Sequence, residues 1–395
     1  MPVKRLIITL ALFFVSRIGI GQAWTQLPDF PGLERDDGIA YVIGNKTYCG
    51  TGLQVGWGLT RDFYEFDLTT ETWTTGVSMP NGAERQYACG FTDGTDGYVF
   101  GGEAYGSDLN DLWMYSPVLG SWMTMPSKPG HGVRGAACFV LYNVAYIIGG
   151  AYSTIDATNE VWAYNITSGT WTQLNNLPFT CWRASATTIN NKGYLTFGRE
   201  VNGRFRKELY EYNPVGDTWT QLSTFPGTGR AYATMQNINN DLFLFGGLDT
   251  LNTYYNTVWS YEISSSQWTQ RTSLPSFGRK GGMGFTSNSI LYYTCGIDQS
   301  NTRLKETWKY DVTVGIKEIE KKEIMAIYPN PASDHIVIRS TKSILQGRTY
   351  KIINMQGEIA LNGTLSENGY IYLTSLSQGI YQLLIGNSST RIVVQ

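Results

Sequence analysis

The sequence predicts an all-β chain in which a six-bladed β-propeller is followed by a small immunoglobulin-like β-sandwich. Two observations predict the propeller: a tryptophan recurs six times at intervals of 48 or 49 residues, and each repeat holds four short strand-like runs. A third observation predicts the sandwich, because the repeat stops near Val314 and a different alternating pattern begins. Four antiparallel strands make one propeller blade, and closure into a ring leaves only short strand edges exposed.

Four landmarks recur in every repeat. The tryptophans are Trp24, Trp73, Trp122, Trp171, Trp219 and Trp268. The arginines that follow them are Arg35, Arg85, Arg134, Arg183, Arg230 and Arg279. The glycines that close the next apolar run are Gly52, Gly102, Gly150, Gly198, Gly247 and Gly296. An aromatic pair two positions apart comes next, such as Trp113 and Tyr115. Four landmarks in six copies indicate six copies of one structural unit.

The order of the strands within a blade follows from the sizes of their side chains. In the third repeat we expect strands at Gly135–Tyr142, Val144–Ile148, Glu160–Asn165 and Thr170–Leu174. The first strand of each repeat is rich in Gly, Ala and Ser, which suits the crowded axis where the blades converge. The tryptophan and tyrosine pairs are expected on the outer strands, where the space between blades widens.

The two ends of the repeat region are expected to meet. The sixth repeat has three strands, the last ending at Lys309-Tyr310-Asp311, and no tryptophan strand follows. The strand that is missing there stands at the front of the chain, at Trp24–Leu27. We therefore predict that Trp24–Leu27 completes the sixth blade and closes the ring.

This order of landmarks resembles the Kelch repeat family, over residues 24–314. The family pattern has an arginine, a small-residue strand, an apolar run ending in Gly-Gly, an aromatic pair and a tryptophan strand. Three repeats depart from the double glycine, with Thr51-Gly52, Phe197-Gly198 and Cys295-Gly296. We expect the propeller domain to span residues 22–314.

A charged linker, residues 315–324, leads to a second domain at 325–395. Its predicted strands are His335–Arg339, Tyr350–Asn354, Tyr370–Leu373, Tyr381–Ile385 and Arg391–Val394, a number and length typical of a small β-sandwich. The segment resembles the type A C-terminal sorting domain of type IX secretion substrates, through Tyr328-Pro329-Asn330-Pro331, Ile353–Gly357 and Leu376–Tyr381. The resemblance implies secretion machinery of a Gram-negative outer membrane as a partner, and release or attachment at the cell surface.

The N-terminus predicts a signal peptide at residues 1–21. Lys4 and Arg5 precede an apolar run of ten residues, Leu6–Val15, which is too short to span a bilayer. Small residues allow cleavage after Gly21 or Ala23. We expect no transmembrane segment in the mature chain. The net charge of −2 offers no basic surface for nucleic acid.

The arginines and the loops after the glycines are expected at one end of the propeller, where ligands would bind. Six arginines would encircle the channel mouth there, although a structural role for them is favoured because the repeat itself supplies them. Trp57 and Trp182 stand outside the repeat pattern, in loops on that face. The other candidate ligand-binding residues are Tyr105, Tyr152 and Tyr254, with Phe205 and Tyr255 in equivalent loops. Aromatic rings beside charged groups suit carbohydrate, and packing of the loops is the alternative.

Three functions remain open from the sequence: a carbohydrate- or protein-binding module, an enzyme, and a protein-interaction scaffold. No metal or cofactor is expected, because the only histidines, His131 and His335, lie in separate domains and no metal-ligand spacing occurs. The enzymatic alternative is resemblance to bacterial sialic acid mutarotases, which share the six blades and the exported location. Glu200 and Arg206 would be the candidate catalytic residues, as acid/base and carboxylate anchor.

Overall fold

The computed structural model describes residues 24–312, 325–340, 346–385 and 388–395. The chain divides into two compact units, Met1–Gly315 and Ile316–Gln395. The predicted signal peptide (1–21) and the charged linker (315–324) lie outside the described residues, so both stay predictions.

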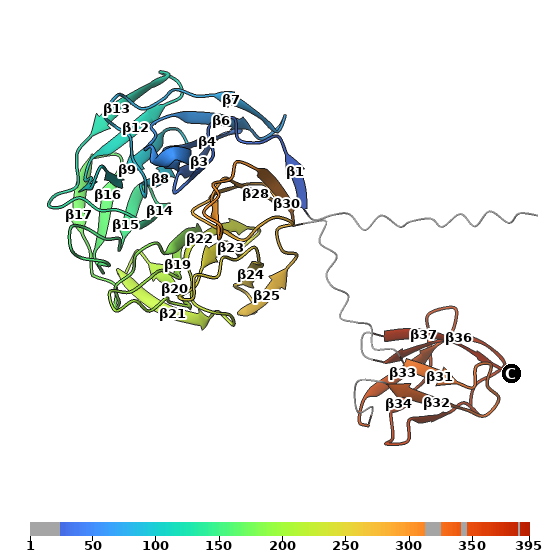
Figure 1. Ribbon diagram of the computed structural model, residues 1–395. Helices are drawn as coiled ribbons and strands as arrows, with labels where there is room; N and C mark the ends of the chain where they lie inside the picture. Colours follow the sequence, from blue (N-terminus) through green and yellow to red (C-terminus); the bar gives the residue numbers. More distant parts are fainter. Residues whose placement is uncertain (1–23, 313–324, 341–345, 386–387) are drawn as a thin grey trace, which may run out of the picture. The chain divides into compact units, whose positions relative to one another are not determined.

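Six four-stranded antiparallel sheets form the first unit and surround a common axis (Figure 1). Blades one to three are β3 (Ile39–Ile43), β4 (Lys46–Gly50), β6 (Phe63–Asp67), β7 (Thr72–Thr75); β8 (Cys89–Thr92), β9 (Gly97–Phe100), β12 (Leu112–Ser116), β13 (Ser121–Met125); and β14 (Ala137–Leu141), β15 (Val144–Ile148), β16 (Val161–Asn165), β17 (Thr170–Gln173).

Blades four to six are β18 (Ser185–Ile189), β19 (Lys192–Thr196), β20 (Glu208–Asn213), β21 (Thr218–Thr224); β22 (Ala231–Ile238), β23 (Asp241–Leu248), β24 (Val258–Glu262), β25 (Gln267–Arg271); and β27 (Met283–Ser287), β28 (Ile290–Thr294), β30 (Thr307–Asp311), β1 (Trp24–Leu27). The predicted six-bladed propeller is confirmed. The predicted strands of the third blade agree with the structure to within two residues at either end.

The N-terminal strand closes the ring, as the sequence predicts. β1 pairs with β30 along its whole length, from Trp24 opposite Tyr310 to Leu27 opposite Thr307. The indole N–H of Trp24 donates to the carbonyl of Thr272 in blade five at 2.9 Å, and the ring lies 5.0 Å from that of Tyr310. Trp24 is buried. β1 therefore completes the last blade and also contacts the blade before it.

Small side chains line the axis and large rings fill the space further out. A cavity of about 190 Å³ along the axis is lined by residues of the first strands, β3, β8, β14, β18, β22 and β27. Further from the axis, aromatic rings pack onto glycines of the next blade: a Cβ added at Gly97 would lie 2.0 Å from Tyr41, and one at Gly193 would lie 2.1 Å from Phe139. The close approach of neighbouring blades thus requires glycine at these two positions.

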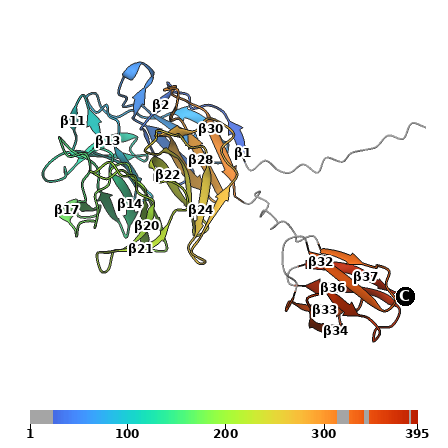
Figure 2. The same cartoon turned by 60° about the horizontal axis from the view of Figure 1, so that its bottom comes forward.

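Three pairs of two-residue strands and one 3₁₀ turn lie at one end of the propeller. They are β2 (Arg35–Asp36) with β5 (Leu53–Gln54), β10 (Glu103–Ala104) with β11 (Ser107–Asp108), β26 (Arg279–Lys280) with β29 (Ile297–Asp298), and the 3₁₀ turn η1 (Val55–Trp57). Figure 2 shows β2 and β11 at this end.

The second unit consists of two antiparallel sheets. Their strand orders are β31 (Met325–Tyr328), β32 (His335–Ser340), β35 (Tyr370–Tyr372), and β34 (Ile359–Thr364), β33 (Thr349–Ile353), β36 (Gly379–Ile385), β37 (Ser388–Val394). One buried cluster joins the sheets and includes Ile336, Ile352, Leu383 and Ile392. The unit therefore has a hydrophobic core of its own, as an independent β-sandwich requires.

The Tyr328–Pro331 motif fastens the last strand of the chain. The side-chain amide of Asn330 donates to the carbonyl of Arg391 at 3.0 Å, and its oxygen accepts from the N–H of Val393 at 2.8 Å. The backbone of Ala332 continues the contact, since its N–H donates to the carbonyl of Val393 at 2.9 Å. The motif thus holds β37 against the start of the unit.

Candidate functional site

The loops after the second strands lie at the same end of the propeller as the segments before the first strands. Antiparallel pairings join the two sets, for example Arg35 with Gln54, Trp182 with Arg199, and Arg279 with Asp298. We call this end the loop face. The sequence places the candidate ligand-binding residues on this face.

A closed ring of six backbone hydrogen bonds surrounds the axis at the loop face. Each member donates its N–H to the carbonyl of the member in the neighbouring blade, at 2.7 to 3.3 Å. The members of this mouth ring are Asp37, Tyr87, Gly135, Arg183, Tyr232 and Gly281. All six have a left-handed backbone, with φ between 57° and 63°. The ring ties every blade to both of its neighbours.

The mouth ring holds residues that its backbone geometry disfavours. A left-handed conformation suits glycine, and two members, Gly135 and Gly281, are glycines. Of the other four, Tyr87, Arg183 and Tyr232 carry side chains for which this conformation is strained, whereas Asp37 adopts it more readily. Strained residues that persist are concentrated at functional sites. The side chains at these four positions therefore point to a role that glycine could not fill.

These four side chains gather into one cluster at the channel mouth. The guanidinium of Arg183 forms an ion pair with Asp37. It also lies between two aromatic rings, 4.9 Å from the centroid of Tyr87 and 4.2 Å from that of Tyr232. The indole of Trp182 packs edge-on against both rings, and its buried N–H has no hydrogen-bond partner. A cation held between rings is favourable when it is shielded from water.

The electrostatics of the cluster depend on burial. Burial raises the pKa of the Asp37 carboxyl to about 7, although the charge of Arg183 acts to lower it. A second cation, the amine of Lys280, lies 4.5 Å from the centroid of the Tyr232 ring. The mouth therefore combines the buried carboxyls of Asp37 and its neighbour Asp36 with two cations and three aromatic rings within one small region.

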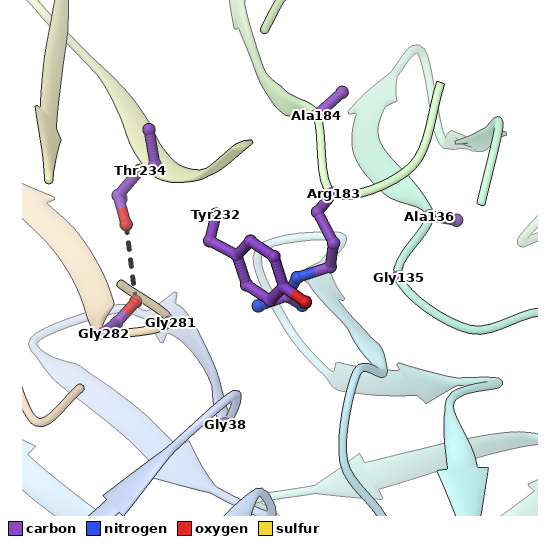
Figure 3. A pocket seen from close by; sticks show the side chains of 10 residues that line it. Gly38, Gly135, Ala136, Arg183, Ala184, Tyr232, Thr234, Gly281 and Gly282 are labelled. Atoms are coloured by element: carbon purple, nitrogen blue, oxygen red, sulfur yellow. Dashed lines mark hydrogen bonds between the residues drawn. The ribbon is translucent and has the colours of Figure 1, made fainter. Parts of the chain in front are cut away.

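A cavity of about 130 Å³ opens beside this cluster (Figure 3). Its walls include Arg183, Tyr232 and Thr234, together with glycines and alanines from five blades. The hydroxyl of Thr234 donates to the carbonyl of Gly282 at 3.3 Å, and Figure 3 marks this bond. The cavity can accept a polar group of about the size of a few water molecules.

The structure corrects the expected ring of six arginines. Four of the arginines are buried beneath the loop face: Arg35, Arg85, Arg230 and Arg279. Three of them bind a carboxylate just ahead of the third strand, as Arg35 does with Asp62 at 2.5 Å, Arg85 with Asp111 at 2.8 Å and Arg279 with Glu306 at 2.6 Å. Arg230 instead bonds the hydroxyl of Thr257 at 2.9 Å. These side chains hold the loops in place and do not line the channel mouth.

The remaining two arginines occupy other positions in the repeat. The glycine that closes the second strand of one blade donates its N–H to a backbone carbonyl at the start of the next blade. This carbonyl belongs to Arg85 at the start of blade two, but to Val133 and Cys181 at the starts of blades three and four. Arg134 and Arg183 therefore stand one and two residues beyond the repeated buried position. Arg134 bonds Asp108 at 2.5 Å near the loop face, and only Arg183 belongs to the mouth ring.

Glu200 and Arg206 form an ion pair inside blade four, and both are buried. The guanidinium of Arg206 lies 3.7 Å from the centroid of Phe179 and bonds the Tyr210 hydroxyl at 3.2 Å. Arg35 stacks on Phe30 in a similar way. In blade four Cys181 occupies the position where other blades have a buried arginine, and Arg206 provides a buried cation there instead. The pair is brought together as expected, but each charge is already satisfied by the other.

Two of the aromatic residues that the sequence suggested for the loop face have exposed side chains. Trp57 is 73% exposed and Tyr105 is 79% exposed. Both have left-handed backbones, with φ of 64° and 50°. Trp57 rests on the guanidinium of Arg303, which lies 4.7 Å from its ring and is ion-paired with Asp36 at 2.6 Å. Neither ring packs in the hydrophobic core, so both can contact a ligand.

The other candidate aromatics are more enclosed. Tyr152 stacks on His131 with ring centroids 3.4 Å apart, and Tyr254 lies 6.0 Å from the amine of Lys280. Phe205 and Tyr255 are partly buried. The sequence-based reasoning named Trp182 and Arg183 at the mouth but missed Asp37, Tyr87, Tyr232 and Lys280.

The comparisons with known proteins decide the family. The KLHDC2/KLHL20/DRC7 Kelch-repeats domain matches residues 24–198 and 135–345, which together cover more than half of the chain. The chain belongs to the Kelch-repeat family. The Secretion system C-terminal sorting domain matches residues 326–395. This Kelch protein is therefore exported by type IX secretion to the cell surface or the extracellular space.

A solved structure shares the propeller fold of this Kelch protein. It is titled "Structure of YjhT", with a TM-score of 0.62 and 19% sequence identity, covering 71% of this chain and 96% of that chain. No match was found among curated proteins. Within the described residues of the Kelch protein, no three metal-binding side chains cluster, and no helix has the length and apolar character needed to cross a membrane.

Proposed function

We propose that this exported Kelch protein binds a saccharide at the channel mouth. The observation that carries the proposal is the mouth ring, where Asp37, Tyr87, Arg183 and Tyr232 keep left-handed backbones and direct their side chains to one place. Residues are held in such conformations where function benefits from them.

The chemistry of the site suits a sugar. The cavity beside Arg183 can take a polar substituent, while Trp57 and Tyr105 offer open aromatic faces on the surrounding loops. Aromatic faces pack against the C–H groups of sugar rings, and fixed polar groups orient the hydroxyls. A protein ligand would use the same exposed rings as anchors, and the experiment below separates the two.

We expect loss of Trp57 or Tyr105 to weaken binding without weakening the fold. Screening the secreted full-length chain on a glycan array identifies the saccharide, and titration calorimetry then measures its affinity. Trp57→Ala and Tyr105→Ala should each cost about 1–3 kcal/mol of binding free energy, because each removes an exposed stacking face. Their melting temperatures should stay within a degree or two of wild type.

Trp122→Ala is the matched control. Trp122 packs 5.0 Å from Phe63 and 5.1 Å from Tyr115 between blades, and its N–H donates to the carbonyl of Val77 at 2.9 Å. Its loss should lower the free energy of unfolding by roughly 3–5 kcal/mol and leave affinity unchanged. If the Trp57 and Tyr105 variants bind as wild type, the loop rings take no part in the site, and if only proteins are captured, the saccharide site is excluded.

A substitution at Glu200 tests the enzymatic alternative. We expect Glu200→Gln to leave saccharide affinity unchanged and to lower the free energy of unfolding by roughly 1–3 kcal/mol, because Arg206 loses one of its two charged partners and keeps only Glu208 at 3.2 Å. Sugar anomerisation, followed by NMR, should be no faster with wild type than with the variant. A faster wild-type rate that the variant loses would instead assign a mutarotase-like activity to this pair.

We also propose the finer points of export. The N-terminal residues 1–21 act as a signal peptide, and the host is a Gram-negative bacterium whose outer-membrane machinery recognises the sorting domain. The pattern at Lys4, Arg5 and Leu6–Val15 supports the first point. The sorting-domain match supports the second.

A further inference from the structure

Two cysteines face each other across the inner wall of the propeller. Cys89 lies on β8, the first strand of blade two, and Cys138 lies on β14, the first strand of blade three. These two strands are neighbours around the axis. Of the five cysteines, Cys49, Cys181 and Cys295 are fully buried away from this wall.

Each sulfur reaches the strand of the other. The thiol of Cys89 donates to the carbonyl of Ala136 at 3.3 Å, and the thiol of Cys138 donates to the carbonyl of Gly90 at 3.5 Å. Ala136 is two residues before Cys138, and Gly90 directly follows Cys89. The two thiols also lie close enough to affect one another: the neighbouring Cys138 thiol is the largest cause of the raised pKa of Cys89.

In other blades a hydroxyl makes the hydrogen bond to the next blade that the Cys89 thiol makes in blade two, so this bond does not require cysteine. Ser185 in blade four donates to the carbonyl of Ala233 at 2.7 Å, and Thr234 in blade five donates to the carbonyl of Gly282 at 3.3 Å. These hydroxyls make the same link between first strands that Cys89 makes. Among the described residues, two facing first strands both carry a cysteine only in blades two and three; Cys49 and Cys295, which share a buried cluster, lie outside the first strands.

The surroundings give a small reagent access to the pair. Cys89 and Cys138 both line the axial cavity of about 190 Å³. Cys138 is partly exposed, whereas Cys89 is buried. Export also takes the chain out of the cytosol, where thiols are kept reduced, into compartments where disulfides form and persist.

We propose that Cys89 and Cys138 form a disulfide that joins blades two and three in the exported protein. The oxidant is the disulfide of a thiol oxidase in the export compartment, which reaches Cys138 before the blades close around the axis. The thiolate of the more exposed Cys138 attacks one sulfur of that disulfide, forms a mixed disulfide and releases the first oxidase thiolate. The thiolate of Cys89 then attacks the Cys138 sulfur and displaces the second. The two cysteine protons leave with the two oxidase thiols, so one disulfide is exchanged for another.

The bond would close a loop of about 50 residues, one blade of the propeller, and would restrict the unfolded chain. It would act together with the mouth ring, where Gly135 donates to the carbonyl of Tyr87 at 2.8 Å between the same two blades. The proposal does not depend on the ligand of the loop face.

Thiol counting on the secreted full-length protein tests the proposal. Protein collected from the medium without reductant, denatured and alkylated, should carry label on three of its five cysteines, and on all five after reduction. Trypsin together with a Glu-specific protease cuts at Glu160 and so separates Cys138 from Cys181. Mass spectrometry should then find one linked peptide pair, containing Cys89 and Cys138.

Variants connect the bond to stability. Reduction should lower the melting temperature of the wild type by roughly 5–10 °C. Cys89→Ser and Cys138→Ser should each lose this dependence on reductant and expose one additional thiol, while Cys49→Ser should keep the dependence. Five labelled cysteines in the secreted wild type, or a linked pair that uses Cys49, Cys181 or Cys295, would overturn the proposal.

Discussion

Deleting Trp24–Leu27 is expected to lower the free energy of unfolding by at least about 5 kcal/mol. Loss of a buried aromatic side chain alone costs roughly 3–5 kcal/mol, and Trp24 is buried against Tyr310. The deletion also removes the backbone bonds between β1 and β30 and the indole bond to Thr272. Blade six then ends in an open edge, and the ring loses its closure. Guanidinium unfolding of the wild type and the deletion variant measures the difference.

A point variant and its neighbour separate closure from simple shortening of the chain. Trp24→Ala should reproduce roughly 3 kcal/mol or more of the loss, because the buried ring makes the contacts to two blades. Thr25→Ala should change stability by less than about 0.5 kcal/mol, since Thr25 points to solvent in the same strand. A deletion variant with the unfolding midpoint of the wild type would show that β1 is dispensable for closure.

The propeller could be predicted from the sequence because its repeat is almost constant in length. Each blade packs against one equivalent blade on either side, so the same residue types are needed at the same positions around the ring. Trp24 could even be assigned to blade six, since it matches the tryptophan strands of the other blades. The sorting domain was harder because it has no internal repeat. β34 was missed, since Ile359–Thr364 is mostly exposed and contains Asn362-Gly363, which is typical of a turn.

The mouth ring was missed for a different reason. The arginines do not keep one position in the repeat, since Arg134 and Arg183 are shifted by one and two residues from the buried position. Each ring member lies 15 residues before the glycine that closes the second strand, as Asp37 does for Gly52 and Tyr232 for Gly247. Alignment on these glycines would have found all six positions. The side-chain cluster itself joins residues from different blades, and sequence spacing does not reveal such contacts.

Removing residues 325–395 is expected to leave a folded propeller that no longer reaches the cell surface. The buried cluster of the second unit consists entirely of residues from Ala332 to Val394, so its loss takes nothing from the cores of the blades. The truncated chain should therefore keep its melting temperature and its affinity on the loop face. The sorting-domain match implies that secretion depends on the missing segment. Cell fractionation with immunoblotting should find the truncated protein in the periplasm and the full chain outside.

A milder variant tests whether the folded form of the sorting domain is what the machinery recognises. Asn330→Ala removes both side-chain bonds that hold β37, to Arg391 and Val393. Tyr372→Ala changes a side chain that is 67% exposed and far less involved in packing. If recognition requires β37 to be held in place, Asn330→Ala should reduce the exported fraction several-fold while Tyr372→Ala does not. Normal export of the chain lacking 325–395 would contradict a sorting role for the whole segment. Normal export of Asn330→Ala alone would mean that the machinery recognises the sequence of the strand and does not need the Asn330 hydrogen bonds that hold β37.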